Sequence, residues 1–102
     1  HWIGYGQSPQ GTLTVDKGAH AALMHGGRSL LPKGLTAVAG MFRAGDCVRC
    51  CTPDGHEFAR GLVNYSAEEL RRIQGMHSIH IEETLGYKFT DEVIHRNDFV
   101  LL

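Results

Sequence analysis

The sequence has no long hydrophobic run, no excess of charge of one sign and few cysteines. No apolar stretch approaches the roughly 18 residues that a membrane-spanning helix needs, and no signal peptide opens the chain, so no membrane partner is expected. Ten Lys and Arg against eleven Asp and Glu give a formal net charge of −1, whereas a nucleic-acid-binding domain is usually clearly basic. The three cysteines cannot all pair and lie close together, which indicates a reducing, cytoplasmic location.

The motifs of phosphate binding and nucleophilic catalysis are also missing. Neither G-x-x-x-x-G-K-[ST] nor G-x-G-x-x-G follows a predicted strand. No histidine stands at a spacing from a serine or cysteine that suggests a catalytic pair. We therefore predict no catalytic residue, no metal and no cofactor for this chain. Its 102 residues, 42% hydrophobic and 21% charged, are typical of one soluble domain with a modest core.

Hydrophobic patterning predicts many short strands and a few short helices. Strands are expected over 11–15, 35–42, 47–52, 57–65 and 92–102, with helices after Asp16, after Ser66 and from Ser78 to Leu85. This order indicates a small, strand-dominated α+β barrel of mixed strands with two to three short helices.

Individual residues mark the ends of these elements. Asp16 suits a helix N-cap, and Ser66 with Glu69 forms a capping box, in which each side chain accepts a hydrogen bond from the other residue's backbone amide. Ser78 is expected to cap the last helix. Gly61, inside a strand, indicates a bulge or the close approach of another segment.

The cysteines form the pattern Cys47-x-x-Cys50-Cys51, which with His56 nearby invites a zinc site. In a strand, however, Cys47 and Cys50 point to opposite faces, so that Cys47 and Cys51 alone share one. A second clean pair of ligands is missing. We favour partly buried structural thiols over a metal site.

A second candidate metal cluster is His77, His80 and Glu83, which recur at a spacing of three residues. On a helix they would stack on one side, where they would hold a metal weakly. A solvated polar face is the favoured alternative, because Ser78 as N-cap would place His77 outside the helix.

The loop that follows the first helix, from Gly26 to Gly34, is a candidate for binding an anion or nucleic acid. Its glycines expose backbone amides and its two cations flank them, an arrangement that can hold a phosphate. The residues concerned are Gly27, Arg28, Lys33 and Gly34. The alternative is a crossover connection whose glycines are needed for steric reasons and whose charged side chains face water. We favour this alternative, because no aromatic stacking platform lies beside the loop.

Several short motifs follow one another in a specific order and spacing along nearly the whole chain, although each is weak individually. They are Gly11-Thr12-Leu13-x-Val15-Asp16, Ser29-Leu30-Leu31-Pro32-x-Gly34, Phe42-x-x-Gly45-Asp46, Ala59-Arg60-Gly61-Leu62-Val63-Asn64-Tyr65-Ser66 and His95-Arg96-Asn97-Asp98. Together they resemble the C-terminal PUA domain of bacterial glutamate 5-kinase. The resemblance implies a PUA pseudo-barrel over residues 11–102, with residues 1–10 as a linker from a kinase domain that precedes it. The first residue, His1, is then expected to be a cut within a longer polypeptide.

The resemblance also implies a role. The parent family makes L-glutamyl 5-phosphate with ATP and Mg²⁺ in the first step of proline biosynthesis, and its catalytic and proline-sensing residues lie in the kinase domain. This chain is then a regulatory or interaction module, inactive by itself, whose partners are its own kinase domain and other subunits of a homo-oligomer. The alternative is an RNA-binding PUA module of an RNA-modifying enzyme, which the charge balance does not favour.

Overall fold

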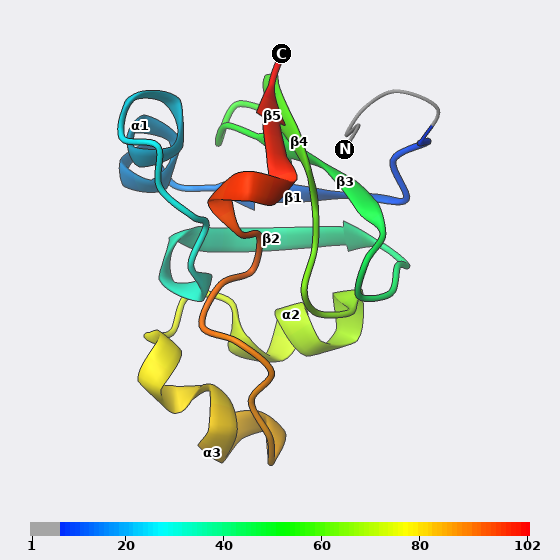
Figure 1. Cartoon of the computed structure of the whole chain (residues 1–102), viewed down its shortest axis with the longest axis vertical. Coiled ribbons are helices and arrows are strands. Elements are labelled where there is room, and N and C mark those ends of the chain that lie inside the picture. The colour runs from blue at the N-terminus through cyan, green and yellow to red at the C-terminus, as the bar shows by residue number, and fades with distance from the viewer. Residues whose placement is uncertain (1–6) are drawn as a thin grey trace.

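The computed structural model describes residues 7–102 and contains a five-stranded mixed sheet (Figure 1). The strands pair in the order β2-β1-β3-β4-β5; β1 and β3 are parallel, and every other pair is antiparallel. Their bounds are β1 (Gly11–Val15), β2 (Leu35–Gly40), β3 (Cys47–Cys51), β4 (Glu57–Leu62) and β5 (Phe99–Leu101). The strand-dominated α+β class expected from the sequence is confirmed.

Three short helices accompany the sheet, as predicted: α1 (Lys17–His25), α2 (Ala67–Ile73) and α3 (Ile81–Leu85). Asp16 caps α1 by accepting a hydrogen bond from the Ala19 amide at 2.7 Å. Both bonds of the capping box are formed at the start of α2, from the Ser66 amide to Glu69 at 2.8 Å and from the Glu69 amide to Ser66 at 3.2 Å. These local bonds satisfy amides that a helix start otherwise leaves open.

The sheet curls around the core. In Figure 1, β1 and β2 lie across the view while β4 and β5 run crosswise to them, and α2 lies below β2. The side chains enclosed between the curled sheet and the helices form one continuous cluster, to which β1 to β4 contribute buried side chains, and the partly buried Phe99 of the short β5 packs against it. Its largest members that are almost completely buried are Tyr65, Leu13, Leu30, Leu35, Leu70, Ile73, Ile81 and Ile94.

The strand predicted over 92–102 is much shorter in the structure. Ile94 forms an isolated bridge with Leu30, and a 3-10 turn at Arg96–Asp98 follows before β5 begins. The His95 side chain caps that turn by accepting a bond from the Asn97 amide at 3.1 Å. A long-range pairing and a side-chain cap, neither visible as periodicity, therefore replace most of the predicted strand. The strands predicted to end at residues 42, 52 and 65 similarly stop at Gly40, Cys51 and Leu62.

Ser78 is not the N-cap predicted for the last helix. It is the first residue of a 3-10 turn, Ser78–His80, that precedes α3, and the His77 ring caps this turn by accepting a bond from the Ile79 amide at 3.1 Å. The Ser78 hydroxyl is buried and donates to the Asp91 carbonyl at 3.3 Å instead. The Ser78 side chain therefore bonds a residue that is distant in the sequence, and it does not cap the helix as the local pattern predicts.

The close approach predicted at Gly61 is confirmed. A Cβ atom at this position would lie 2.8 Å from Cγ2 of Ile94 and 3.0 Å from the carbonyl oxygen of Asp98. The absence of a side chain allows the segment before β5 to cross directly over β4.

The first six residues of the linker expected over 1–10 lie outside the described part of the chain. Among the rest, Gln10 is already tied to the sheet through a 2.8 Å bond from its amide to the Cys47 carbonyl. Across residues 7–102, no helix is both long enough and apolar enough to cross a membrane.

Candidate anion-binding site

The loop singled out in the sequence runs along the edge of the molecule, from the end of α1 to the start of β2. Gly26 ends α1, and its amide donates to the Ala22 carbonyl at 2.9 Å. Gly27 follows with φ of +58°, a left-handed conformation that glycine adopts without strain. The chain then passes through the bridge at Leu30 into the 3-10 turn Pro32–Gly34.

The structure divides the four candidate residues between two neighbouring hollows. Gly27 lines the first hollow, Lys33 and Gly34 line the second, and Arg28 lines both. The loop therefore does not form the single phosphate cradle that its sequence suggests.

The second hollow is poorly suited to an anion. Its walls are largely apolar, from Ala19, Leu23 and their neighbours, and the Asp16 carboxylate lies among them. Gly34 packs against α1 so closely that a Cβ atom would be 2.5 Å from Cβ of Ala19. Close packing explains the glycine at this position.

The first hollow has a volume of about 570 Å³ and contains residues that sequence reasoning missed. Its other wall is the segment that precedes β5, which contributes Glu92, His95 and Arg96. We name this space, between residues 26–29 and 92–96, the Arg28/Arg96 hollow. The sequence held no signal for it, because the two walls are more than 60 residues apart and meet through tertiary pairing.

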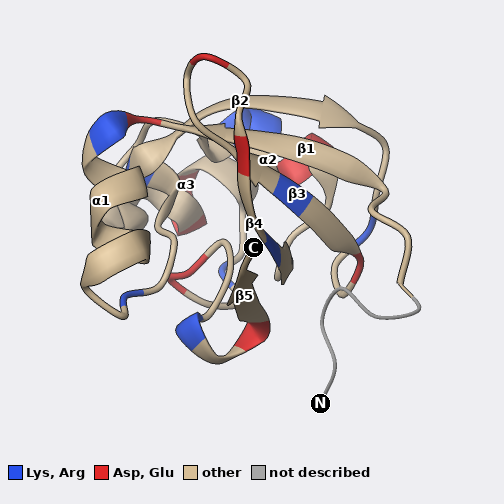
Figure 2. Ribbon diagram, turned by 90° about the horizontal axis from the view of Figure 1, so that it is seen from above, with Lys and Arg blue, Asp and Glu red and all other residues tan. Residues whose placement is uncertain are grey.

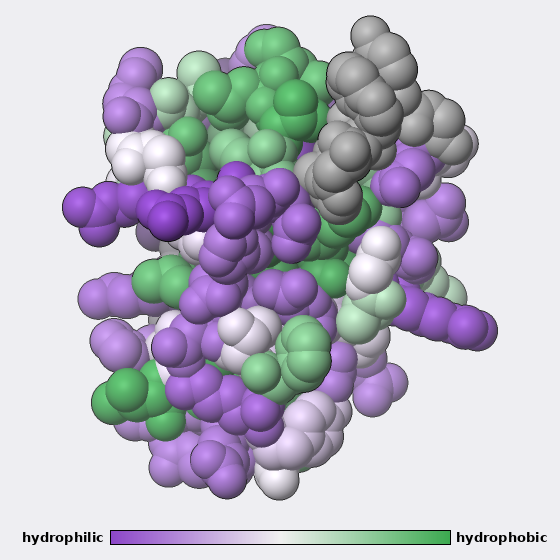
Figure 3. Space-filling view, in the orientation of Figure 1, coloured by the Kyte–Doolittle hydropathy of each residue, from purple (hydrophilic) through white to green (hydrophobic). Residues whose placement is uncertain are grey.

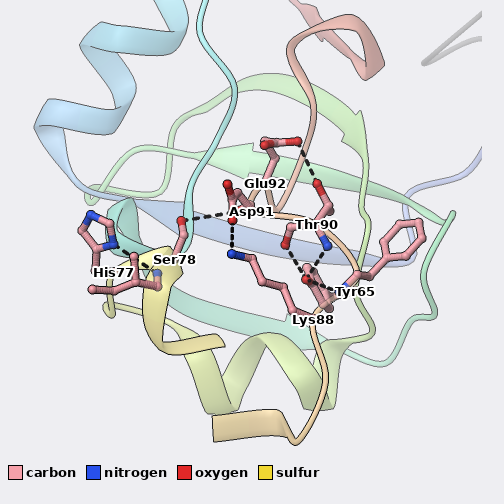
Figure 4. Close-up of polar contacts among 9 residues, drawn as sticks. Tyr65, His77, Ser78, Lys88, Thr90, Asp91 and Glu92 are labelled. Atoms are coloured by element: carbon pink, nitrogen blue, oxygen red, sulfur yellow. Dashed lines mark hydrogen bonds and ion pairs between the residues drawn. The ribbon is translucent and has the colours of Figure 1, made fainter. Parts of the chain in front are cut away.

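Glu92 lies at the end of a segment that is held by buried and partly buried polar groups (Figure 4). The hydroxyl group of the buried Tyr65 accepts from the amides of Phe89 and Thr90 at 3.1 and 2.9 Å, and donates to the Thr90 carbonyl at 2.5 Å. The Thr90 hydroxyl donates in turn to the Glu92 carboxylate at 2.9 Å. Lys88 and Asp91 form an ion pair on the same segment. The position of Glu92 is therefore set by contacts that extend into the core.

The cysteine cluster is buried and free of disulfides. Cys50 belongs to the core cluster, while Cys47 and Cys51 lie outside it, as the alternation of a strand predicts. Four residues along a strand separate Cys47 and Cys51 by about 13 Å, too far to share one ion. Burial raises the pKa of the Cys50 thiol to about 12.

The histidine candidates are not brought together either. His80 contacts Glu83 at 2.5 Å, but the His77 ring is engaged with the Ile79 amide. Within residues 7–102, no group of three or more His, Cys, Asp or Glu side chains is placed to hold a metal ion.

Charge and hydropathy are distributed unevenly over the surface. Figure 2 shows that Lys and Arg are spread over several separate elements. In Figure 3 a hydrophilic band crosses the middle of the view, over the turn Arg96–Asp98 and the loop after α1, whereas hydrophobic residues gather above it near β5.

Comparison with known proteins shows strong similarity to one enzyme. The chain is 54% identical over 101 residues to a glutamate 5-kinase of Synechococcus sp. (strain JA-2-3B'a(2-13)) and 51% identical over 102 residues to that of Trichlorobacter lovleyi. It matches their C-terminal region. The alignments cover 99% and 100% of this chain but 27% of each relative, so the chain spans about a quarter of their length.

The fold also matches a solved structure. A PUA domain from Aeropyrum pernix K1, in a tartrate complex, superposes with a TM-score of 0.61 at 24% identity, over 84% of this chain and 41% of that one. The family model described as the PUA domain matches residues 11–85, which include β1 to β4 and all three helices. The chain therefore belongs to the PUA domain family.

Proposed function

We propose that this chain is the C-terminal PUA domain of a glutamate 5-kinase, with residues 11–102 as the domain and residues 1–10 as the linker to the kinase domain. The observation that carries this proposal is identity of about 50% over the whole chain to enzymes of that name, of which it covers 27%. Similarity of that level along the entire length favours the kinase over an RNA-modifying enzyme as the parent protein.

In this proposal the domain does not carry out the chemistry. The parent enzyme transfers a phosphoryl group from ATP, with Mg²⁺, to the γ-carboxylate of glutamate, in the cytoplasm and as the first step of proline biosynthesis. The residues described here do not fit an ATP or Mg²⁺ site: the sequence has no phosphate-binding loop, and residues 7–102 offer no cluster of metal ligands. The role left for the domain is regulation and assembly of the enzyme.

The regulatory role is tested in the intact enzyme. The full-length kinase is compared with a version that lacks residues 11–102, by measuring turnover of ATP and glutamate, inhibition by proline and oligomer size. We expect the truncated enzyme to keep its catalytic activity but to change in proline inhibition or in oligomer size. Unchanged inhibition together with unchanged oligomer size would show that the regulatory role is wrong.

The identity of the parent protein is tested separately. The coding sequence upstream of His1 should encode an amino-acid kinase domain in frame, and the 102-residue chain alone should not turn over ATP and glutamate. An upstream domain of an RNA-modifying class, or activity of the chain alone, would contradict the proposal.

A further inference from the structure

We propose that the Arg28/Arg96 hollow is a binding site for a small oxyanion that carries two negative charges, such as a phosphate group or a dicarboxylate. Two arginines, Arg28 and Arg96, line it, one from each wall. Planar guanidinium groups bind phosphate and carboxylate oxygens through paired hydrogen bonds, so two of them suit a ligand with several oxygens and a double charge.

Both guanidinium groups are available to a ligand. Within residues 7–102, neither Arg28 nor Arg96 has a carboxylate at ion-pair distance or a side-chain hydrogen bond. By contrast, the arginine side chains of the sheet and of α2 have partners within the chain. Arg49 and Arg60 share the Glu57 carboxylate, and the α2 side chains Arg71 and Arg72 donate to backbone carbonyls.

Further hydrogen-bond donors line the same hollow. Nδ1 of His95 accepts from the Asn97 amide at 3.1 Å, so the neutral ring carries its proton on Nε2, where it is free to donate. The Ser29 hydroxyl oxygen accepts from the Arg96 amide at 2.8 Å, which leaves its own proton for a ligand. Glu92 is the one carboxylate among the residues that line the hollow, and it already accepts a bond from Thr90. With two arginines and one glutamate, the lining has a formal charge of about +1, which favours an anion.

The two walls are held together without a ligand. The Leu30 amide donates to the Ile94 carbonyl at 2.9 Å, and the Val93 amide donates to the Leu30 carbonyl at 2.7 Å. Leu30 and Ile94 are both almost completely buried. The backbone positions of the two arginines are therefore fixed before a ligand binds, which reduces the conformational entropy that is lost on binding.

The size and surroundings of the hollow favour a small ligand over RNA. A volume of about 570 Å³ lies within the range of roughly 300–1,000 Å³ that is usual for small-molecule sites. RNA binding relies on many phosphate contacts along a basic surface, and the basic residues here lie on separate elements (Figure 2) of a chain with net charge −1.

The test is an NMR titration of the ¹⁵N-labelled 102-residue chain with inorganic phosphate and, separately, with malonate, at constant ionic strength. We expect saturable shifts confined to the amides of Gly27 to Ser29 and of His95 to Asn97. R28Q and R96Q should each weaken binding about tenfold or more, because each removes one charge-assisted contact. Whichever probe binds more tightly identifies the ligand as phosphate-like or dicarboxylate-like.

Matched variants make the result specific. K33Q removes a cation that lines the neighbouring hollow alone, and R43Q removes an exposed cation from a different surface. Both variants should bind phosphate as the unaltered chain does. Arg28 and Arg96 are exposed, and their side chains bond no other residue within 7–102, so their variants should keep the remaining resonances unchanged.

Three results would overturn the proposal. The first is the absence of saturation by either probe, and the second is an equal loss of binding in K33Q or R43Q. The third is an RNA hairpin that binds through the same arginines with steep salt dependence while phosphate fails to compete. None of these outcomes bears on the kinase assignment, which is tested by the upstream sequence and by activity.

Discussion

At the scale of single residues, the Tyr65 hydroxyl organises the segment between α3 and β5. It is almost completely buried, and it makes three hydrogen bonds to the backbone of residues 89 and 90. Tyr65→Phe leaves these backbone groups without a partner in a partly buried place, which should lower the free energy of unfolding by about 1–3 kcal/mol. Urea unfolding measures the loss, and hydrogen exchange at the Phe89 and Thr90 amides should accelerate.

The exposed Tyr87 provides the control for that substitution. Its hydroxyl donates to the Glu69 carboxylate at the surface, where a water molecule can replace the lost hydrogen-bond partner. Tyr87→Phe should therefore cost less than Tyr65→Phe. An equal cost in the two variants would show that burial of the Tyr65 network does not matter.

Gly61 is the position where a single methyl group should disturb packing most clearly. In Gly61→Ala the new Cβ would meet the Ile94 side chain and the Asp98 carbonyl at 3.0 Å or less. Overpacking of this kind costs about 1–3 kcal/mol, which thermal or urea unfolding would detect. The matched control is Gly18→Ala, at an exposed position in the first turn of α1, where the Cβ has room and should stabilise the helix by about 0.5–1 kcal/mol. Similar effects of the same sign in both variants would contradict the packing argument.

The three buried cysteines should be unreactive and independent of metal. Because burial raises the pKa of Cys50 to about 12 and also raises the pKa of Cys47 and Cys51, little thiolate exists at pH 8 to react with an alkylating reagent. We expect slow modification of the folded chain, rapid modification in urea, and an unchanged melting temperature after treatment with EDTA. A melting temperature that falls sharply with the chelator would indicate a structural metal.

At the scale of elements, the start of α2 should make stability depend on pH. Burial alone would raise the pKa of the Glu69 carboxyl, but hydrogen bonds from the Tyr87 hydroxyl and from Ser66 outweigh it and hold the pKa below its usual value. The stabilisation is therefore present above the unfolded-state pKa of about 4.3, and it is lost as the pH falls from there through the lower folded-state pKa.

Glu69→Gln tests this directly, because the amide oxygen keeps the capping geometry while the charge is removed. The difference in unfolding free energy between the unaltered chain and this variant should be largest near pH 6 and shrink between roughly pH 5 and pH 3. The exposed neighbour Glu68→Gln is the matched control and should show a much weaker trend. A difference that stays constant over this range would contradict the assignment to Glu69.

At the scale of the whole molecule, the sheet should be most stable at its centre. β1 and β3 have neighbours on both sides, whereas β2 and the three-residue β5 are at the edges of the strand order. Local opening begins where few buried contacts and hydrogen bonds hold an element. Native-state hydrogen exchange should therefore be slowest in β1 and β3, and clearly faster in β5. Equal protection of β5 and β3 would show that the domain opens only as a unit.

Local signals proved reliable wherever a residue acts on its sequence neighbours. The Asp16 cap, the capping box of Ser66 and Glu69, and the end of the last helix at Leu85 all form as predicted, and Gly86 follows that end with φ of +90°. Even the alternation of Cys47, Cys50 and Cys51 between faces follows from strand geometry alone. Predictions failed where a distant segment competes for the same groups, as at Ser78, whose hydroxyl bonds Asp91, and at Ile94, which pairs with Leu30.

The sequence by itself determined the fold class, the family and where most elements begin, because periodicity, caps and turn residues act within a few positions along the chain. Only the tertiary structure decided which cations face the same space. It places Lys33 and Gly27 in the lining of different hollows, and it places Arg28 and Arg96 in the lining of the same one. The reason is that the backbone pairing of Leu30 with Ile94 brings together two segments whose spacing in the sequence carries no periodic signal.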